Sequence, residues 1–292
     1  MSKLKVSELF YSIQGEGRYM GVPSIFLRTF GCNFTCGGFG MTKDFFARIK
    51  KGEINNERDV VAQNIDSYKS YKELPLVSSG CDSYASWDPR FKHLSPVLST
   101  DTIASSIMEL LPHQEWREEH LVITGGEPLL GWQRSYPDLL EQPLMKNLKE
   151  LTFETNGTQL LSREFEDYLF QEWTRFGRDK DALTFSVSPK LSVSGEARED
   201  ALKPEVINQY QQIGYTYLKF VVATEEDLDE AEDWINEYKK EGFSGPIYFM
   251  PVGGTDFVYN LNNKTVAELA LKRGYRYSDR LQIPLFKNAW GT

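Results

Sequence analysis

The sequence has no long apolar run and very few cysteines and histidines. Its 292 residues include only 3 cysteines and 3 histidines. No stretch approaches the roughly 20 apolar residues of a transmembrane helix, and the opening MSKLKVSELFYSIQGEG lacks the apolar centre of a signal peptide. A small and odd number of cysteines argues against a disulfide framework. We therefore expect a cytoplasmic protein with reduced thiols and no membrane partner.

Positive charge is also scarce. Lys and Arg total 33 against 42 Asp and Glu, which gives a net charge of −9. A chain of this sign is poorly suited to binding that depends on neutralising nucleic-acid phosphates. We expect no nucleic-acid partner, while a small or buried anionic ligand remains compatible with the charge.

The chain alternates β-rich runs with helical patterns. The β-rich runs are PSIFLRTF near 23, HLVITGGEP near 120, LKELTFETNG near 148, ALTFSVSPK near 182, YTYLKFVVA near 215 and PIYFMPV near 246. Between them lie STDTIASSIMELL, KPEVINQYQQIG, TEEDLDEAEDWINEYKKEG and NNKTVAELALKRG, where apolar residues recur every three or four positions. This alternation predicts the α/β class, with a parallel sheet and crossover helices that form a partial or full barrel.

Three of the predicted strands end in unusual residues, TGGEP, ETNG and SVSPK. Parallel α/β folds place their chemistry at the carboxyl ends of the strands, so these endings would meet on one face. Ordinary turn chemistry explains any single ending equally well. Three endings in series favour a site.

Residues 37–80 interrupt the alternation and separate two cysteines from the third. They are rich in charged and aromatic residues and include a predicted helix from Lys43 to Lys50. We expect one domain over residues 1–292, with residues 37–80 as an inserted segment.

The three cysteines allow several interpretations. Cys32 and Cys36 lie in GCNFTCGGFG, and Cys81 follows the inserted segment. Three thiolates can hold a [4Fe–4S] cluster and leave one iron without a protein ligand. They could also join one histidine in a closed zinc site, as in a non-enzymatic zinc-stabilised α/β binding protein, or stay buried without any ligand. The candidate zinc-binding histidines are His93, His113 and His120.

The order of motifs along the chain resembles the 7-carboxy-7-deazaguanine synthase family of radical S-adenosylmethionine enzymes. The motifs are YSIQGEGRYMGVPSIFLRTFGCNFTC, CDSYASW, TGGEPLL, ETNG and SVSPK. The resemblance implies a partial (β/α) barrel of the radical S-adenosylmethionine type, with an insertion in the cluster-binding loop. A glycyl-radical activase, another short enzyme of this superfamily, would share the cluster motif but not SIQGEG with Arg28.

The resemblance also implies the reaction and its cofactors. The enzyme would be a lyase that contracts the ring of 6-carboxy-5,6,7,8-tetrahydropterin to 7-carboxy-7-deazaguanine with loss of ammonia, in the 7-deazapurine pathway to queuosine. It would carry a [4Fe–4S] cluster on Cys32, Cys36 and Cys81, S-adenosylmethionine, and Mg²⁺ bound by Ser83. Its partners would be a reductant such as flavodoxin or ferredoxin and a second copy in a homodimer.

By the same resemblance, two sets of residues would bind the small molecules. Glu16 and Arg28 would be catalytic, and the substrate-binding set would be Ile13, Gln14, Gly15, Glu16, Arg28 and Thr124. The S-adenosylmethionine set would be Gly80, Asp82, Gly125, Gly126, Glu127, Ser188, Pro189 and Lys190, with Glu154 and Asn156 as supporting residues.

Two positions depart from the family pattern. Phe286 stands where relatives often have His, and Met250 where many have Gln. We therefore expect no polar substrate contact from either side chain.

Overall fold

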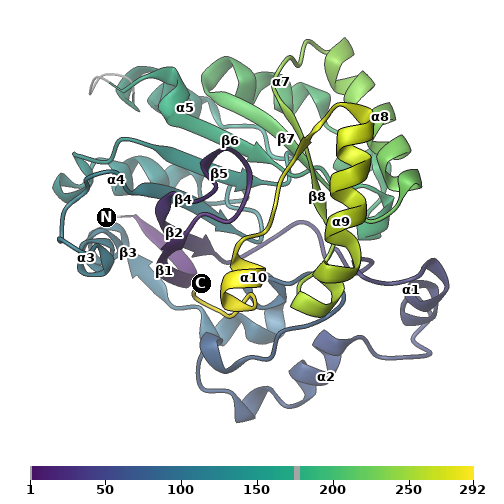
Figure 1. Ribbon diagram of the computed structural model, residues 1–292. Coiled ribbons are helices and arrows are strands. Elements are labelled where there is room, and N and C mark those ends of the chain that lie inside the picture. Colours follow the sequence, from purple (N-terminus) through teal and green to yellow (C-terminus); the bar gives the residue numbers. More distant parts are fainter. Residues whose placement is uncertain (1, 174–177) are drawn as a thin grey trace.

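The computed structural model describes residues 2–173 and 178–292, and its centre is a nine-stranded open sheet (Figure 1). The strand order is β3-β1-β2-β4-β5-β6-β7-β8-β9, with β3 and β9 at the edges. The strands are β1 (Lys3–Ile13), β2 (Pro23–Thr29), β3 (Val97–Ser99), β4 (His120–Gly125), β5 (Leu151–Thr155), β6 (Leu183–Val187), β7 (Tyr215–Val222), β8 (Ile247–Pro251) and β9 (Arg276–Tyr277). The predicted α/β class and partial barrel are confirmed.

The sheet is parallel from β2 to β9 and antiparallel at its other end. β1 pairs antiparallel with both β2 and β3. All six β-rich runs of the sequence form strands, because their near-continuous apolar residues are covered on both faces. The strands β1, β3 and β9 are not among the predicted runs. β3 and β9 have 3 and 2 residues, too few for a periodic pattern to show.

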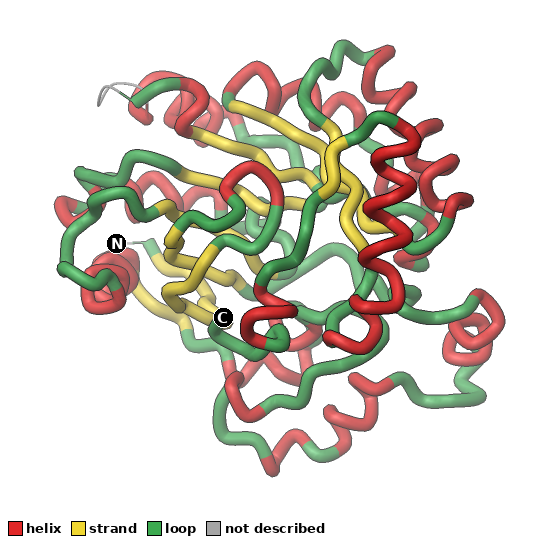
Figure 2. Tube along the Cα trace, in the orientation of Figure 1, coloured by secondary structure: helices red, strands yellow, loops and turns green. Residues whose placement is uncertain are grey.

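Helices lie around the outside of the curved sheet (Figure 2). They are α1 (Lys43–Lys50), α2 (Glu57–Gln63), α3 (Thr100–Leu110), α4 (Tyr136–Leu140), α5 (Arg163–Asp167), α6 (Arg198–Ala201), α7 (Pro204–Ile213), α8 (Glu225–Lys240), α9 (Asp256–Arg273) and α10 (Gln282–Phe286). The four helical patterns read from the sequence correspond to α3, α7, α8 and the second half of α9. α8 begins with a capping box in which Thr224 and Asp227 each accept from the other's backbone N–H.

The main core fills the space between the sheet and these helices. It includes Phe153 and Phe185 on neighbouring strands, Tyr210 on α7 and Trp234 on α8, all fully buried. Within residues 2–173 and 178–292, no helix is both long and apolar enough to cross a membrane.

Residues 37–80 leave the barrel and return to it at nearly the same point. The backbone N–H of Gly80 donates to the carbonyl of Phe39 at 2.7 Å. Between these two residues, α1 and α2 lie outside the ring of helices (Figure 1), and the predicted helix Lys43–Lys50 is α1. The segment contributes to a second, smaller core made of Val61, Tyr71, Leu74, Val77, Tyr84, Ala85 and Phe91. Its status as an insertion into a single domain stays a prediction.

Candidate active site

One cavity opens at the carboxyl ends of the parallel strands. Its wall includes residues from successive strands, among them Arg28 on β2, Thr124 on β4, Glu154 on β5, Lys219 on β7 and Met250 on β8. The Gly-rich and polar strand endings therefore do meet on one face, as parallel α/β architecture requires. The cavity brings together most of the residues singled out from the sequence.

The three cysteines all line this cavity, and all are free thiols. Cys36 has a left-handed backbone with φ of 47°, and its N–H donates to Glu196 Oε1 at 2.6 Å. The N–H of Phe34 donates to Cys32 Sγ at 3.4 Å. Because the inserted segment returns where it left, Cys81 joins the other two despite its distance along the chain.

The electrostatics of the thiols show that they form one group. Burial raises the pKa of Cys32 to about 12 and raises those of Cys36 and Cys81 as well. Cys32 and Cys36 each interact electrostatically with Cys81, and the positive charge of Lys190 acts against the rise in pKa at all three thiols. Buried thiols become thiolates when cationic metal stabilises them.

This donor set fits an iron–sulfur cluster better than zinc. His120 is fully buried and its ring nitrogens lie 3.2 Å from Ser24 Oγ and 2.7 Å from Thr152 Oγ1. His93 and His113 are exposed and do not line the cavity. Throughout residues 2–173 and 178–292, no three His, Cys, Asp or Glu side chains converge on a single metal ion. A four-iron cluster needs another arrangement, in which each thiolate binds its own iron.

Two glycines at the end of β4 let the cysteine loop pack closely against the sheet. A Cβ on Gly126 would lie 2.7 Å from Cys32 Cβ, closer than real side chains approach. Gly125 has φ of 151°, in the region that favours glycine. Both glycines line the cavity, so these positions combine tight packing with backbone exposed to a ligand.

Glu127 follows these glycines but is turned away from the cavity. It is fully buried, does not line the cavity, and accepts from three groups: Leu129 N–H at 3.0 Å, Thr155 Oγ1 at 2.8 Å and Asn156 N–H at 2.7 Å. Burial raises the pKa of Glu127 to about 7, although these hydrogen bonds oppose the rise. Its position points to a role in joining the ends of β4 and β5.

The Gln-Gly-Glu segment after β1 forms another wall of the cavity. Gln14 is buried; its Nε2 donates to Glu154 Oε1 at 3.0 Å and its Oε1 accepts from the N–H of Glu16 at 3.1 Å. Ile13 and Gly15 also line the cavity. The amide of Gln14 is thus held rigidly by one carboxylate and one backbone group.

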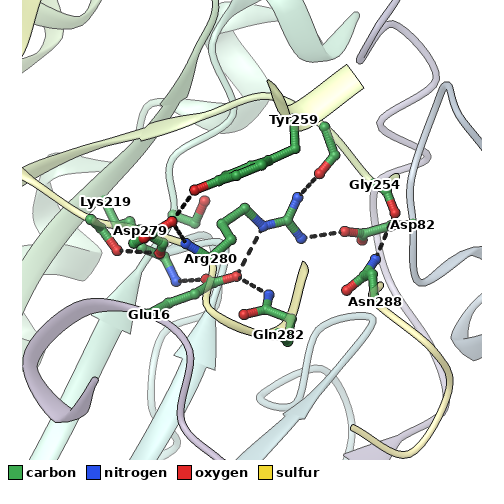
Figure 3. Close-up of polar contacts among 12 residues, drawn as sticks. Glu16, Asp82, Lys219, Gly254, Tyr259, Asp279, Arg280, Gln282 and Asn288 are labelled. Carbon is green, nitrogen blue, oxygen red and sulfur yellow. Dashed lines mark hydrogen bonds and ion pairs between the residues drawn. The ribbon is translucent and has the colours of Figure 1, made fainter. Parts of the chain in front are cut away.

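Glu16 lies at the centre of a buried charged network (Figure 3). Its Oε2 pairs with Lys219, and its Oε1 accepts from Gln282 Nε2 at 2.8 Å and from Arg280 Nε at 3.2 Å. Burial alone would raise the pKa of Glu16, but the two cations hold it well below its usual range. Arg280 Nη2 also donates to Asp82 Oδ2 at 2.6 Å.

Arg28 lines the cavity and is held there by two neighbours. Its Nε pairs with Glu8 Oε2 at 2.9 Å, and its Nη1 lies 3.2 Å from Ser83 Oγ. Ser83 Oγ is also 3.3 Å from Asp82 Oδ1. Ser83 therefore faces the cavity between a guanidinium and a carboxylate.

The remaining predicted residues divide between the cavity wall and other places. Gly80, Asn156, Ser188 and Lys190 line the cavity, and Lys190 Nζ lies 3.1 Å from Ser188 Oγ. Pro189 and Phe286 do not line it, and Phe286 is exposed on α10. Met250 does line it, and its side chain there is apolar.

Several cavity residues were missed in the sequence. They are Glu8, Lys219, Arg280, Gln282, Asn288 and Trp290. Lys219 left a signal, because a lysine within the apolar run YLKFVV needs a buried partner. Arg280 and Gln282 left none, since their partner Glu16 lies 264 and 266 positions away.

Known proteins resemble this chain along nearly its whole length. A 7-carboxy-7-deazaguanine synthase from Halobacterium salinarum is 30% identical over 310 residues, which cover 98% of this chain and 91% of that protein. The protein of the same name from Rhodopirellula baltica is 28% identical over 304 residues, covering 100% and 90%.

A solved structure shares the fold. The crystal structure of QueE from Escherichia coli superposes with a TM-score of 0.54 and 20% identity, over 94% of this chain and 93% of that one. No protein-family model matches the sequence.

Proposed function

This chain belongs to the 7-carboxy-7-deazaguanine synthase family, and from that premise we propose how its cavity performs the family's reaction. The family's enzymes are radical S-adenosylmethionine lyases, and this membership implies a [4Fe–4S] cluster and S-adenosylmethionine. When bound, these two groups would supply the radical chemistry for converting 6-carboxy-5,6,7,8-tetrahydropterin to 7-carboxy-7-deazaguanine with loss of ammonia. The observation that carries the proposal is the convergence of three free thiols on the cavity that Gln14, Glu16 and Arg28 also line.

Cys32, Cys36 and Cys81 would hold the cluster. Lys190 would offset part of the negative charge of the thiolates, since its ammonium already acts on all three thiols. Gly80, Asp82, Gly125, Gly126, Ser188 and Lys190 would face S-adenosylmethionine. Glu127 and Pro189 would support this part of the cavity from behind, because neither lines it.

Gln14 and Glu16 would bind the guanidine-like edge of the pterin, with Ile13, Gly15 and Thr124 completing the wall. The low pKa of Glu16 keeps it an acceptor, which suits a ligand edge made of N–H donors. Arg28 would bind the substrate carboxylate. Its Nε is taken by Glu8, so the guanidinium would approach the carboxylate through its two terminal nitrogens.

Ser83 would provide a hydroxyl ligand for Mg²⁺, in keeping with the preference of this cation for oxygen. Because Arg28 Nη1 lies 3.2 Å from the hydroxyl, binding of the cation would require the guanidinium to turn toward the substrate carboxylate. A reductant such as flavodoxin or ferredoxin, a homodimer and a cytoplasmic location complete the proposal.

Anaerobic cluster reconstitution tests the thiols. We expect about four irons per chain in the wild-type protein and a loss of iron in Cys81→Ala as complete as in Cys32→Ala. Ser79→Ala, two residues before Cys81, is the matched control and keeps its iron. A colourless wild-type protein with one zinc, or a Cys81→Ala variant with normal iron, would contradict the assignment.

Turnover then tests the reaction. The reconstituted protein is supplied with 6-carboxytetrahydropterin, S-adenosylmethionine, Mg²⁺ and a reductant, and 7-carboxy-7-deazaguanine is measured by mass spectrometry. Cleavage of S-adenosylmethionine without this product would favour another reaction of the superfamily, such as glycyl-radical activation.

A further inference from the structure

Arg280 connects three segments of the cavity wall that are far apart in the sequence. It is buried, and each part of its guanidinium has a different partner (Figure 3). Nε donates to Glu16 Oε1, Nη2 donates to Asp82 Oδ2 at 2.6 Å, and Nη1 donates to the carbonyl of Gly253 after β8. One side chain therefore contacts the Gln-Gly-Glu segment, the residue after Cys81, and the loop after β8.

The backbone around Arg280 is itself tied to the Gln-Gly-Glu segment. Leu281 N–H donates to the carbonyl of Gly15 at 3.1 Å, and Gly17 N–H donates to Ser278 Oγ at 2.9 Å. The N–H of Arg280 donates to Asp279 Oδ1 at 2.7 Å. A shift of residues 15–17 would therefore move Arg280 directly.

The two carboxylates that Arg280 joins repel each other. Both carboxylates lie against the same guanidinium, Glu16 Oε1 at 3.2 Å from Arg280 Nε and Asp82 Oδ2 at 2.6 Å from Arg280 Nη2. Buried like charges need a cation between them, because the interior screens them weakly. Lys219 pairs with Glu16, whereas Arg280 pairs with both Glu16 and Asp82.

We propose that Arg280 is a positioning residue that couples the pterin half of the cavity to the S-adenosylmethionine half. The inference rests on the proposed function, in which Glu16 faces the pterin and Asp82 faces S-adenosylmethionine. A ligand that orders Glu16 also orders Arg280, and Arg280 then orders Asp82 for the second ligand. Such coupling is reciprocal, so each ligand tightens the binding of the other by the same factor.

The planar fork of arginine is essential to this role. Its three nitrogens point in fixed directions and hold Glu16 and Asp82 at the same time. A lysine at this position would keep the charge but bind as a single point. We therefore expect Arg280→Lys to retain much of the electrostatic balance and to lose the coupling.

The test is a binding cycle with the anaerobic, cluster-loaded protein in the absence of reductant. Calorimetry measures the dissociation constant of S-adenosylmethionine with and without saturating 6-carboxypterin, the oxidised analogue used as a probe. We expect the probe to tighten S-adenosylmethionine binding by about fivefold or more in the wild-type protein. In Arg280→Lys the factor should fall to about one, even where each ligand alone still binds.

Two variants serve as comparisons. Arg276→Lys alters an arginine that donates to Tyr248 Oη outside the cavity, and it should keep the wild-type factor. Asp82→Asn removes the charge of one partner of Arg280 and leaves the arginine itself unchanged. In this variant the probe should no longer tighten S-adenosylmethionine binding. It replaces Arg280→Lys in the test if Arg280→Lys does not load its cluster.

The outcomes separate the inference from the proposed function. If the two ligands bind the wild-type protein independently, or if Arg280→Lys and Asp82→Asn keep the full factor, the coupling role is wrong and the proposed function stands. If neither ligand binds the loaded wild-type protein, the proposed function itself fails, and the inference fails with it.

Discussion

Glu8 and Arg28 face each other across the antiparallel pair β1 and β2, with Arg28 Nε 2.9 Å from Glu8 Oε2. Only 6% of the Glu8 side chain and 17% of the Arg28 side chain are exposed. Removing one member of such a pair leaves a buried charge without its partner, which costs more than the pair itself contributes. The pair therefore holds the guanidinium in place, and loss of either partner would destabilise the fold.

The first prediction is that Glu8→Ala lowers the free energy of unfolding by about 3 kcal/mol, because it leaves Arg28 uncompensated. Urea unfolding followed by circular dichroism measures it. The double variant Glu8→Ala/Arg28→Ala should lose less than the sum of the two single variants. As a control, Asp167→Ala breaks an exposed pair with Arg163 and should cost less than about 0.5 kcal/mol. A Glu8→Ala variant as stable as the wild type would refute the prediction.

The sequence predicts the framework of this fold better than its charged network. The apolar pattern predicts strands at PSIFLRTF, HLVITGG and YTYLKFVV, because both faces of a parallel strand are apolar. β1 mixes charged and apolar residues in KLKVSELFYSI, since it pairs antiparallel at the end of the sheet, and it was not predicted. Periodicity thus finds central strands more easily than peripheral ones.

The site could be predicted where its residues lie within motifs. Cys32, Gln14 and Gly126 all line the cavity as expected from their motifs. Glu127 belongs to a motif as well, but its oxygens accept from Leu129 N–H, Thr155 Oγ1 and Asn156 N–H, which only the three-dimensional arrangement reveals. Arg280 reaches Glu16 across 264 positions, and no local pattern encodes a contact of that range.

The second prediction concerns Ser83. Ser83→Ala should keep a full complement of iron and raise the Mg²⁺ concentration needed for half-maximal turnover by about tenfold or more, because the hydroxyl oxygen is lost. Ser83→Thr keeps an oxygen at the same position and should behave like the wild type. Iron analysis and Mg²⁺ titration of the rate measure the two effects. An unchanged Mg²⁺ dependence in Ser83→Ala would exclude the hydroxyl as a ligand.

The third prediction concerns Trp290, which ties the end of the chain to the inserted segment. Its Nε1 donates to the carbonyl of Leu74 at 2.8 Å, and its ring contacts Tyr71 edge-on with centroids 4.8 Å apart. Trp290→Ala should cost about 2 kcal/mol of local stability, because the smaller core loses an aromatic contact. In hydrogen-exchange measurements, residues 61–91 should exchange faster in Trp290→Ala than in the wild type, whereas the strands of the sheet should exchange at the wild-type rate.

Two variants sharpen that measurement. Trp290→Phe keeps a ring but loses the Nε1 donor, so it should fall between the wild type and Trp290→Ala. Leu271→Ala removes an apolar side chain that is 78% exposed on α9 and should leave exchange at residues 61–91 unchanged. If these residues exchange in Trp290→Ala at the wild-type rate, the stability of the smaller core does not depend on Trp290.

The fourth prediction is a pH dependence of stability that originates at Glu127. Its pKa is raised from 4.5 to about 7 in the folded protein, chiefly by burial. The folded state therefore binds a proton that the unfolded state has already released. The resulting stabilisation is fully present below about pH 4.5 and is lost as the pH rises through about 7. A difference of 2.5 pKa units corresponds to about 3 kcal/mol.

Glu127→Gln isolates this contribution in the cluster-free protein. The variant cannot ionise. Its amide N–H₂ faces at least one of the groups that donate to the carboxylate in the wild type, which lowers the free energy of unfolding by an amount that does not change with pH. The advantage of the wild type over the variant should therefore shrink by about 2.5 kcal/mol between about pH 5 and about pH 8 in urea unfolding. Glu164→Gln, at an exposed carboxyl on α5, is the matched control. A wild-type advantage that stays constant, or grows with pH, would show that Glu127 is ionised throughout this range and that its three hydrogen bonds outweigh burial.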